Sequence, residues 1–171
     1  TTDDNELAEL VRMLLRHGGK DKYNVDHIGY NARLDTLQAA VLLVRLKYVD
    51  QFNQKRRQVA EIYNQAFSTN TNIITPQCCN ICYDVSHQYT IRIKHGLRDQ
   101  VQQKLQESGI DSAIYYPLPL HQMKVFNDRS ENATQLSQAE TRCQEVLSLP
   151  IDPLMTTTEI THVVNTILLA L

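Results

Sequence analysis

The apolar positions near the start of the chain recur three and four residues apart, at Leu7, Leu10, Val11 and Leu14. This spacing is typical of one face of an α-helix. Asp3 and Glu6 precede the stripe in the arrangement of a capping box, and Gly18 follows it, where helices commonly end. The pattern therefore predicts a first helix that ends before Gly18.

Residues 35–67 predict one or two long helices, because no glycine or proline interrupts them and Asp35 with Gln38 supplies a helix start. The second half is amphipathic around Val59, Ile62, Tyr63 and Ala66. The first half is apolar on nearly every side, at Leu37, Ala39, Ala40, Val41, Leu42, Leu43, Val44 and Leu46. A helix of this kind needs cover on every side, so we predict that a second domain or subunit packs against it.

After residue 72 the pattern changes to short runs typical of β-strands. Residues 73–75 form the first run, and residues 86–94 form a second. In the second run Tyr89, Ile91 and Ile93 alternate with polar residues. This alternation predicts a strand with one buried face.

The rest of the chain mixes helices with one more strand. Residues 97–107 predict an amphipathic helix stopped by Gly109, and residues 112–116 a short strand. The last two helices, at 137–146 and 156–171, each begin with a capping box, Ser137 with Glu140 and Thr156 with Glu159. The predicted fold class is α+β, with a small antiparallel or mixed sheet flanked by helices.

Composition and charge narrow the classes of function. The 171 residues are 42% hydrophobic and carry a net charge of −2, which lacks the basic excess expected of a nucleic-acid-binding protein. The longest apolar run, residues 39–44, is too short to cross a bilayer. The acidic, polar start does not resemble a secretory signal, so we expect a cytoplasmic location.

The cysteines predict no metal centre. Cys78, Cys79 and Cys82 provide half of a zinc or redox site, but the sequence has no second pair and Cys143 lies in a separate predicted helix. A redox C-x-x-C pair is expected to open a helix after a strand, whereas this one precedes a strand. We therefore interpret these cysteines as small loop residues.

Residues 18–32 show neither helical nor strand periodicity. This predicts an irregular loop that is long enough to have a function of its own. At its end, Asn31 and Arg33 stand just before a predicted helix N-terminus, which favours anions such as phosphate or carboxylate. An alternative remains open: Asn31 makes a turn, Arg33 pairs with an acid and Asp35 caps the helix.

A second candidate segment, residues 115–121, has the sequence Y-Y-P-L-P-L-H. Tyr115, Tyr116 and His121 lie there on a backbone that two prolines stiffen. By itself this pattern favours the alternative, in which the tyrosines pack under a loop. The histidines show no spacing typical of a metal site or a catalytic triad.

Three segments together resemble the DegT/DnrJ/StrS family of pyridoxal-phosphate-dependent nucleotide-sugar aminotransferases. They are D-N-E-L-A-E at residues 4–9 with R-H-G at 16–18, H-I-G-Y-N-A-R-L-D-T-L-Q-A-A at 27–40, and Y-Y-P-L-P-L-H at 115–121. The resemblance spans nearly the whole chain and covers the C-terminal part of such enzymes. It implies a small domain of a fold-type-I aminotransferase.

The resemblance also implies a division of the chain. Residues 1–34 would be a helix and loop from the end of the large domain, 35–67 the interdomain and interface helices, and 68–171 the small α+β domain. In the family, the Schiff-base lysine lies in the large domain, upstream of this portion. None of the lysines here matches its motif, so the resemblance implies that the chain alone binds no pyridoxal phosphate and is inactive.

Residue by residue, the resemblance assigns cofactor and substrate contacts. Asn31 would reach across a homodimer to the phosphate of the partner subunit's pyridoxal phosphate. Arg33 would line the same site and face the sugar nucleotide, and Tyr115, Tyr116 and His121 would lie near the substrate entrance.

The family reaction moves an amino group, usually from glutamate, to a keto group of a UDP- or dTDP-linked sugar. The chain's expected partners are therefore a second copy, the missing large domain, the nucleotide-sugar and glutamate. The alternative is a truncated, non-catalytic dimerisation or interaction module. A third possibility, a regulatory domain that binds a small ligand, is supported by fold analogy alone.

Overall fold

The computed structural model describes residues 1–21, 23–77, 79, 81–129 and 136–171. Its elements are α1 (Asn5–Leu14), α2 (Thr36–Leu46), α3 (Val49–Phe67), β1 (Ile73–Ile74), β2 (Tyr89–Ile93), α4 (Arg98–Glu107), η1 (Leu120–Gln122), η2 (Lys124–Arg129), α5 (Ser137–Glu145), β3 (Val146–Leu149) and α6 (Thr157–Ala170). Their contacts divide the chain into two units, Thr1–Tyr48 and Val49–Leu171.

The second unit is built on a three-stranded sheet in the order β1-β2-β3, with both neighbours antiparallel to β2. Tyr89 pairs with Leu149 across β2 and β3, and Ile73 pairs with Ile93 across β1 and β2. Tyr89, Ile91 and Ile93 are buried, whereas the residues between them are half-buried. The alternation predicted for this strand is therefore confirmed.

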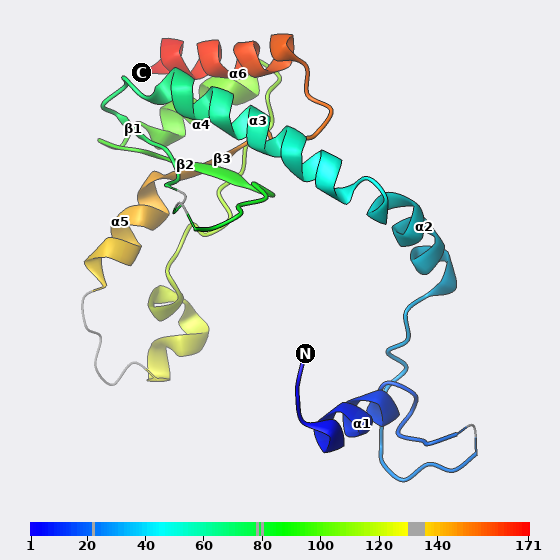
Figure 1. The fold of residues 1–171 in the computed structure, drawn as a ribbon. Helices are drawn as coiled ribbons and strands as arrows, with labels where there is room; N and C mark the ends of the chain where they lie inside the picture. Colours follow the sequence, from blue (N-terminus) through cyan, green and yellow to red (C-terminus); the bar gives the residue numbers. More distant parts are fainter. Residues whose placement is uncertain (22, 78, 80, 130–135) are drawn as a thin grey trace. The chain divides into compact units, whose positions relative to one another are not determined.

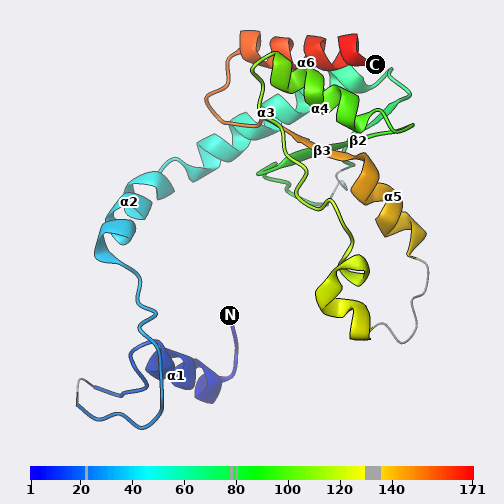
Figure 2. The ribbon, with the colours of Figure 1, turned by 180° about the vertical axis from the view of Figure 1, so that it is seen from behind.

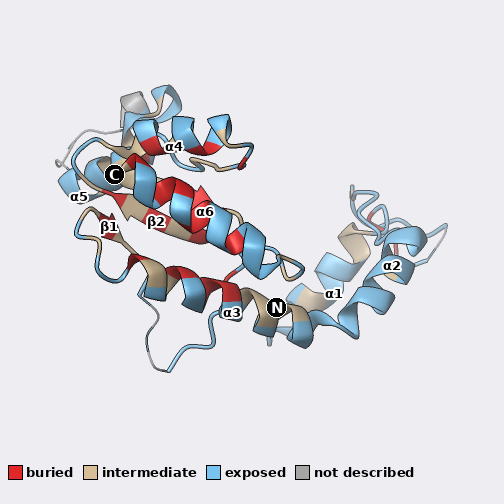
Figure 3. Ribbon diagram, turned by 90° about the horizontal axis from the view of Figure 1, so that it is seen from above, coloured by how far each residue is buried: buried red, intermediate tan, exposed pale blue. Residues whose placement is uncertain are grey.

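Helices α3, α4 and α6 pack together on one face of this sheet (Figures 1 and 2). Figure 3 shows that their buried positions face inward and that their outer faces are exposed. The largest fully buried side chains are Tyr63, Tyr89, Phe67, Ile91, Ile93, Leu105, Leu147, Ile167 and Val101. Burial raises the pKa of both Tyr63 and Tyr89 above the usual range of a phenol. The predicted α+β class, with a small antiparallel sheet and flanking helices, is confirmed.

Two details of the predicted strands are wrong. The segment 112–116 forms only a single bridge, between Ala113 and Ser148, and not a strand. Ser148, the partner of Ala113, belongs to β3. The sequence did not predict this strand, because its apolar residues directly follow α5 and continue the helical pattern of α5. Pairing with β2 buries Leu147, so a non-local contact decides the strand.

The helix caps follow the sequence in part. The Thr156–Glu159 capping box forms as predicted. The Glu159 carboxylate accepts a hydrogen bond from the backbone N–H of Thr156, and this bond lowers the pKa of Glu159. The cap of α1 is Asp4 and not Asp3, since the Asp4 carboxylate accepts from the backbone N–H groups of Glu6 and Leu7. Ser137 is the first helical residue of α5 and caps nothing, since Leu136 occupies the N-cap position.

Between residues 35 and 67 the structure has two helices, α2 and α3. Val59, Ala60, Tyr63 and Phe67 bury the predicted amphipathic face of α3 in the second unit. Helix α2 lies in the first unit, and none of its residues is buried. The division between the units falls inside the segment 35–67, whose role as a domain interface stays a prediction. None of the helices in the described ranges has the length and hydrophobicity that crossing a membrane requires.

Candidate functional site

Asn31 lies on a short extended segment that pairs with the end of α1. Tyr30 N–H donates to the carbonyl of Leu14 at 2.7 Å, and its own carbonyl accepts from His17 N–H at 2.9 Å. Arg16 and Asn31 form the bridge of this antiparallel pairing. The side chain of Asn31 is exposed and forms no hydrogen bond with the residues that the structure describes. The backbone is thus held firmly while the side-chain amide remains available.

Two glycines make this pairing possible. A Cβ on Gly29 would lie 2.1 Å from the backbone nitrogen of Gly18, and one on Gly18 would lie 1.7 Å from the carbonyl oxygen of His27. Gly18 also has a left-handed φ of +85°. The loop that leads to Asn31 therefore crosses the end of α1 at a distance that only glycine allows.

Arg33 lines a cavity of about 540 Å³ within the first unit, together with Arg16, His17, Gly19, Lys20, Asp21 and Val25. The two guanidinium groups form no ion pair in the described part of the chain. Asp21 is committed to the loop, since its carboxylate accepts from the backbone of Tyr23 and Asn24, which lowers its pKa. The lining therefore offers an excess of positive charge to an anion.

Lys20 adds to this charge but has a carboxylate partner. Its ammonium lies 2.8 Å from Asp26, and the hydrogen bond and charge of Asp26 raise the pKa of Lys20. The same pair lowers the pKa of Asp26. Arg16 and Lys20 were not predicted as site residues. The R-H-G run at the end of α1, with a lysine two residues later, is the signal in the sequence that points to them.

The local alternative for this segment holds only in part. Asp35 caps α2, accepting from Leu37 N–H at 3.4 Å, as both interpretations require. Asn31, however, lies in an antiparallel bridge instead of a turn. No acid among the described residues pairs with Arg33. The hydrogen bonds and ion pairs therefore reveal no structural role for the side chains of Asn31 and Arg33.

In the second unit, Tyr115 and Tyr116 follow the Ala113–Ser148 bridge and are 54% and 70% exposed. Tyr115 lines a cavity of about 270 Å³, whose polar lining includes His87, Asp111 and Ser148. Tyr116 is not among the residues that line this cavity. Neither ring is packed under a loop, as the alternative for this segment would require.

His121 lies on η1, five residues beyond Tyr116, and does not share the cavity of Tyr115. Its Nε2 atom lies 2.9 Å from Oε1 of Glu140 on α5. The His121 side chain is 20% exposed. The segment therefore presents the tyrosines to solvent and holds the imidazole against a carboxylate.

A family model described as the DegT/DnrJ/EryC1/StrS aminotransferase family matches residues 1–168. The chain belongs to this family. The match includes both units and confirms the family that the motifs indicate.

Relatives and solved structures agree with this membership. A pleiotropic regulatory protein of Geobacillus stearothermophilus is 42% identical over 154 residues, 89% of this chain and 41% of the relative. The dTDP-3-amino-3,6-dideoxy-alpha-D-galactopyranose transaminase of Aneurinibacillus thermoaerophilus is 36% identical over 98% of this chain and 45% of its own length. The crystal structure of S. venezuelae DesV is 33% identical, with a TM-score of 0.89 over 99% of this chain and 46% of that one. The chain thus spans less than half the length of these aminotransferase-family proteins.

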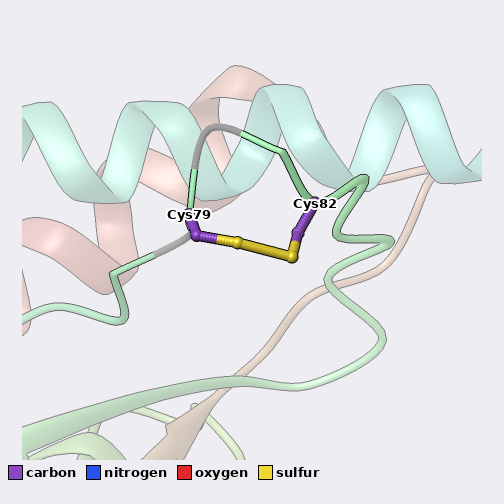
Figure 4. Close-up of a disulfide and its surroundings, with 2 residues drawn as sticks. All are labelled: Cys79 and Cys82. Carbon is purple, nitrogen blue, oxygen red and sulfur yellow. A yellow bond between two sulfur atoms is a disulfide. The ribbon is translucent and has the colours of Figure 1, made fainter.

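The cysteine cluster of this family member differs from its sequence interpretation. Cys79 and Cys82 form a disulfide in the loop between β1 and β2 (Figure 4), whereas the sequence indicated only small loop residues that bind no metal. Cys78 lies outside the described residues. Cys143 is a free thiol on α5. Among the described residues, no three potential His, Cys, Asp or Glu ligands gather at one point.

Proposed function

We propose that this chain is the C-terminal portion of a pyridoxal-phosphate-dependent aminotransferase that acts on a UDP- or dTDP-linked keto-sugar, with glutamate as the amino donor. The observation that carries the proposal is the cationic cavity lined by Arg16, Lys20 and Arg33, together with the exposed amide of Asn31 two residues before Arg33, in a member of this aminotransferase family. The transaminase activity named for the Aneurinibacillus relative supports a nucleotide-linked sugar as the substrate class.

We further propose the division of the chain into domains that the family resemblance implies. Residues 1–34 would belong to the end of a large domain, residues 35–67 to an interface with that domain and a second subunit, and residues 68–171 to the small domain. The uncovered apolar surface of α2 supports the interface assignment.

The donors in the first unit fit the phosphate end of pyridoxal phosphate. When bound, this cofactor supplies the electron sink that transfer of an amino group needs. The Asn31 amide, which has no partner in the described chain, would donate to the phosphate of the cofactor held by the other subunit. Its fixed backbone means that little conformational freedom is lost when the bond forms.

Arg33 would bind the diphosphate of the sugar nucleotide. A guanidinium presents a planar pair of N–H donors that matches phosphate oxygens, and Arg16 in the same cavity offers a second pair. Tyr115, Tyr116 and His121 would contact the substrate at its entrance. The exposed rings of the two tyrosines provide flat apolar surfaces for a sugar or a base, and the imidazole provides a polar contact.

Substitutions of Asn31 and Arg33 in the full-length enzyme test these assignments. We expect Asn31→Ala to weaken cofactor retention about ten- to a hundredfold, because a hydrogen bond to a charged group contributes roughly 1.5 to 3 kcal/mol. Arg33→Ala should raise the KM for the nucleotide-sugar or lower turnover and leave cofactor affinity nearly unchanged. Cofactor titration, substrate kinetics and melting curves measure the three effects.

Asn165→Ala and Arg142→Ala serve as matched controls, since both side chains are exposed on helices of the second unit. Neither control should change ligand binding. An equal loss of thermal stability in both test variants, with no selective change in either ligand, would show that Asn31 and Arg33 only shape the start of α2. Unchanged cofactor affinity in a folded, dimeric Asn31→Ala enzyme would remove the phosphate assignment.

We also propose that the 171-residue chain lacks the lysine that binds pyridoxal phosphate covalently. Incubation with the cofactor, borohydride reduction and peptide mapping should therefore give only slow, scattered labelling of lysines and no transaminase turnover. The exposed Lys104, which pairs with Glu107 on α4, provides an internal reference for an ordinary surface amine. One lysine labelled stoichiometrically, together with turnover, would contradict the proposal.

A non-catalytic dimerisation or interaction module is the second candidate, and the exposure of α2 is the observation that favours it. Such a module would self-associate but would not need the donors around Arg33. Retention of association, with no ligand effect from Asn31→Ala or Arg33→Ala in the full-length protein, would favour the module over the enzyme.

A further inference from the structure

The bond between His121 and Glu140 joins two elements that are well separated in the chain. The Nε2–Oε1 distance is 2.9 Å, and the side chains of His121 and Glu140 are 20% and 34% exposed. This partial burial distinguishes the pair from fully exposed ion pairs, which contribute little because water and salt screen them.

Glu140 lies on a helix that is itself held against the sheet. At the end of α5, Oε2 of Glu145 accepts from Nε and Nη2 of Arg92 on β2, at 2.9 and 2.6 Å. Nη1 of Arg98, on α4, donates to the carbonyl of Cys143 at 3.0 Å. Three hydrogen bonds therefore attach α5, the helix that carries Glu140, to β2 and α4 of the second unit.

The segment that carries His121 has few other polar links. Upstream, the Ala113–Ser148 bridge attaches it to β3 through two backbone hydrogen bonds. Beyond Ala113, the backbone hydrogen bonds of residues 119–126 are local, such as Gln122 N–H to the Pro119 carbonyl at 3.0 Å. Within the described part of the chain, His121–Glu140 is the only hydrogen bond from residues 114–126 to another element.

The chemistry of this bond determines which ring nitrogen a ligand can reach. An ionised carboxylate only accepts hydrogen bonds, so a hydrogen bond between these two atoms requires the hydrogen on Nε2 of His121. In the neutral ring, Nδ1 then carries a lone pair and acts as an acceptor. It has no hydrogen-bond partner among the described residues, so it can accept from a hydroxyl or N–H group.

We infer that Glu140 is a positioning residue for His121. Its carboxylate keeps the hydrogen on Nε2, directs Nδ1 towards a donor group of the substrate and attaches the segment of Tyr115 and Tyr116 to α5. This inference rests on the proposed function, in which His121 lies at the substrate entrance. A hydroxyl of the sugar is the kind of group that the acceptor would recognise.

The 171-residue chain tests the bond without any ligand. In Glu140→Ala the His121 Nε2–H signal, recorded by ¹H–¹⁵N NMR at about pH 8, where imidazole is ordinarily neutral, should disappear through exchange with water. Glu140→Gln should retain it, because the amide oxygen still accepts. Hydrogen exchange of residues 117–126 should become about tenfold faster in Glu140→Ala only, as expected for the loss of roughly 1.4 kcal/mol. Glu107→Gln, which removes an exposed carboxylate from α4, is the matched control.

An unchanged Nε2–H signal and unchanged exchange in Glu140→Ala would overturn the inference, as would equal losses in the Gln and Ala variants. Substrate kinetics in the full-length enzyme separate it from the proposed function. We expect Glu140→Ala to raise the KM for the nucleotide-sugar and to have little further effect in a His121→Ala background. If His121→Ala itself leaves KM unchanged while the NMR changes occur, the substrate role of His121 fails and the positioning by Glu140 stands.

Discussion

Replacing Leu37, Val41 and Val44 together by glutamine should weaken self-association of this chain by about a thousandfold. These side chains form one stripe of α2 at helical spacing and are 78%, 55% and 59% exposed. A monomer seldom leaves such a surface uncovered, so we expect the chain to be a dimer or larger at micromolar concentration. Loss of roughly 4 kcal/mol of apolar burial corresponds to about three orders of magnitude in Kd. Sedimentation equilibrium measures the change, and glutamine preserves helix propensity.

A second stripe of α2, formed by Leu42, Leu43 and Leu46, lies on the opposite side of the helix and provides the comparison. If only one side contacts the second copy, only one triple variant dissociates, and the other side is left for another domain. Leu154→Gln with Leu169→Gln is the control, since both leucines are exposed outside α2. A wild-type chain that sediments as a monomer and binds no hydrophobic dye would contradict the prediction.

Replacing Gly29 by alanine should open the loop that carries Asn31 and Arg33. The new Cβ would lie 2.1 Å from the nitrogen of Gly18 and 2.5 Å from the carbonyl oxygen of Leu14, and both are backbone atoms that cannot rotate away. Overpacking of this kind costs about 3 kcal/mol, so protection of the amides of His17 and Tyr30 should fall about a hundredfold. Hydrogen exchange of residues 14–32 measures the loss.

Gly96→Ala is the control for this substitution, because a Cβ there meets nothing within 4 Å. Its left-handed φ of +71° costs roughly 1 to 2 kcal/mol locally, in the second unit, and should leave residues 14–32 protected. In the full-length enzyme, Gly29→Ala should weaken both ligands that the loop is proposed to bind. Retained protection of Tyr30 in Gly29→Ala would show that the loop can move away from α1.

Features that depend on neighbours in the chain were predictable from the sequence. The Thr156 cap needs only the residues of one helical turn, and the buried face of β2 needs only the alternation of its side chains. The start of α2 at Asp35 and the family motif at residues 27–40 are equally local. The existence of the main helices and the family assignment followed from such patterns.

The remaining features depend on contacts between distant residues, which no local pattern contains. Strand β3 exists because β2 pairs with it, and Arg16 and Lys20 join Arg33 because the loop folds back across the end of α1. His121 meets Glu140, nineteen residues away, only because α5 is attached to the sheet. Sequence alone indicated candidate side chains for binding an anion or a sugar, such as Asn31, Arg33 and Tyr115, but it missed Arg16 and Lys20. The tertiary structure decided which of them share one cavity and which already have a partner, because hydrogen bonds and ion pairs form only between atoms that the fold brings together.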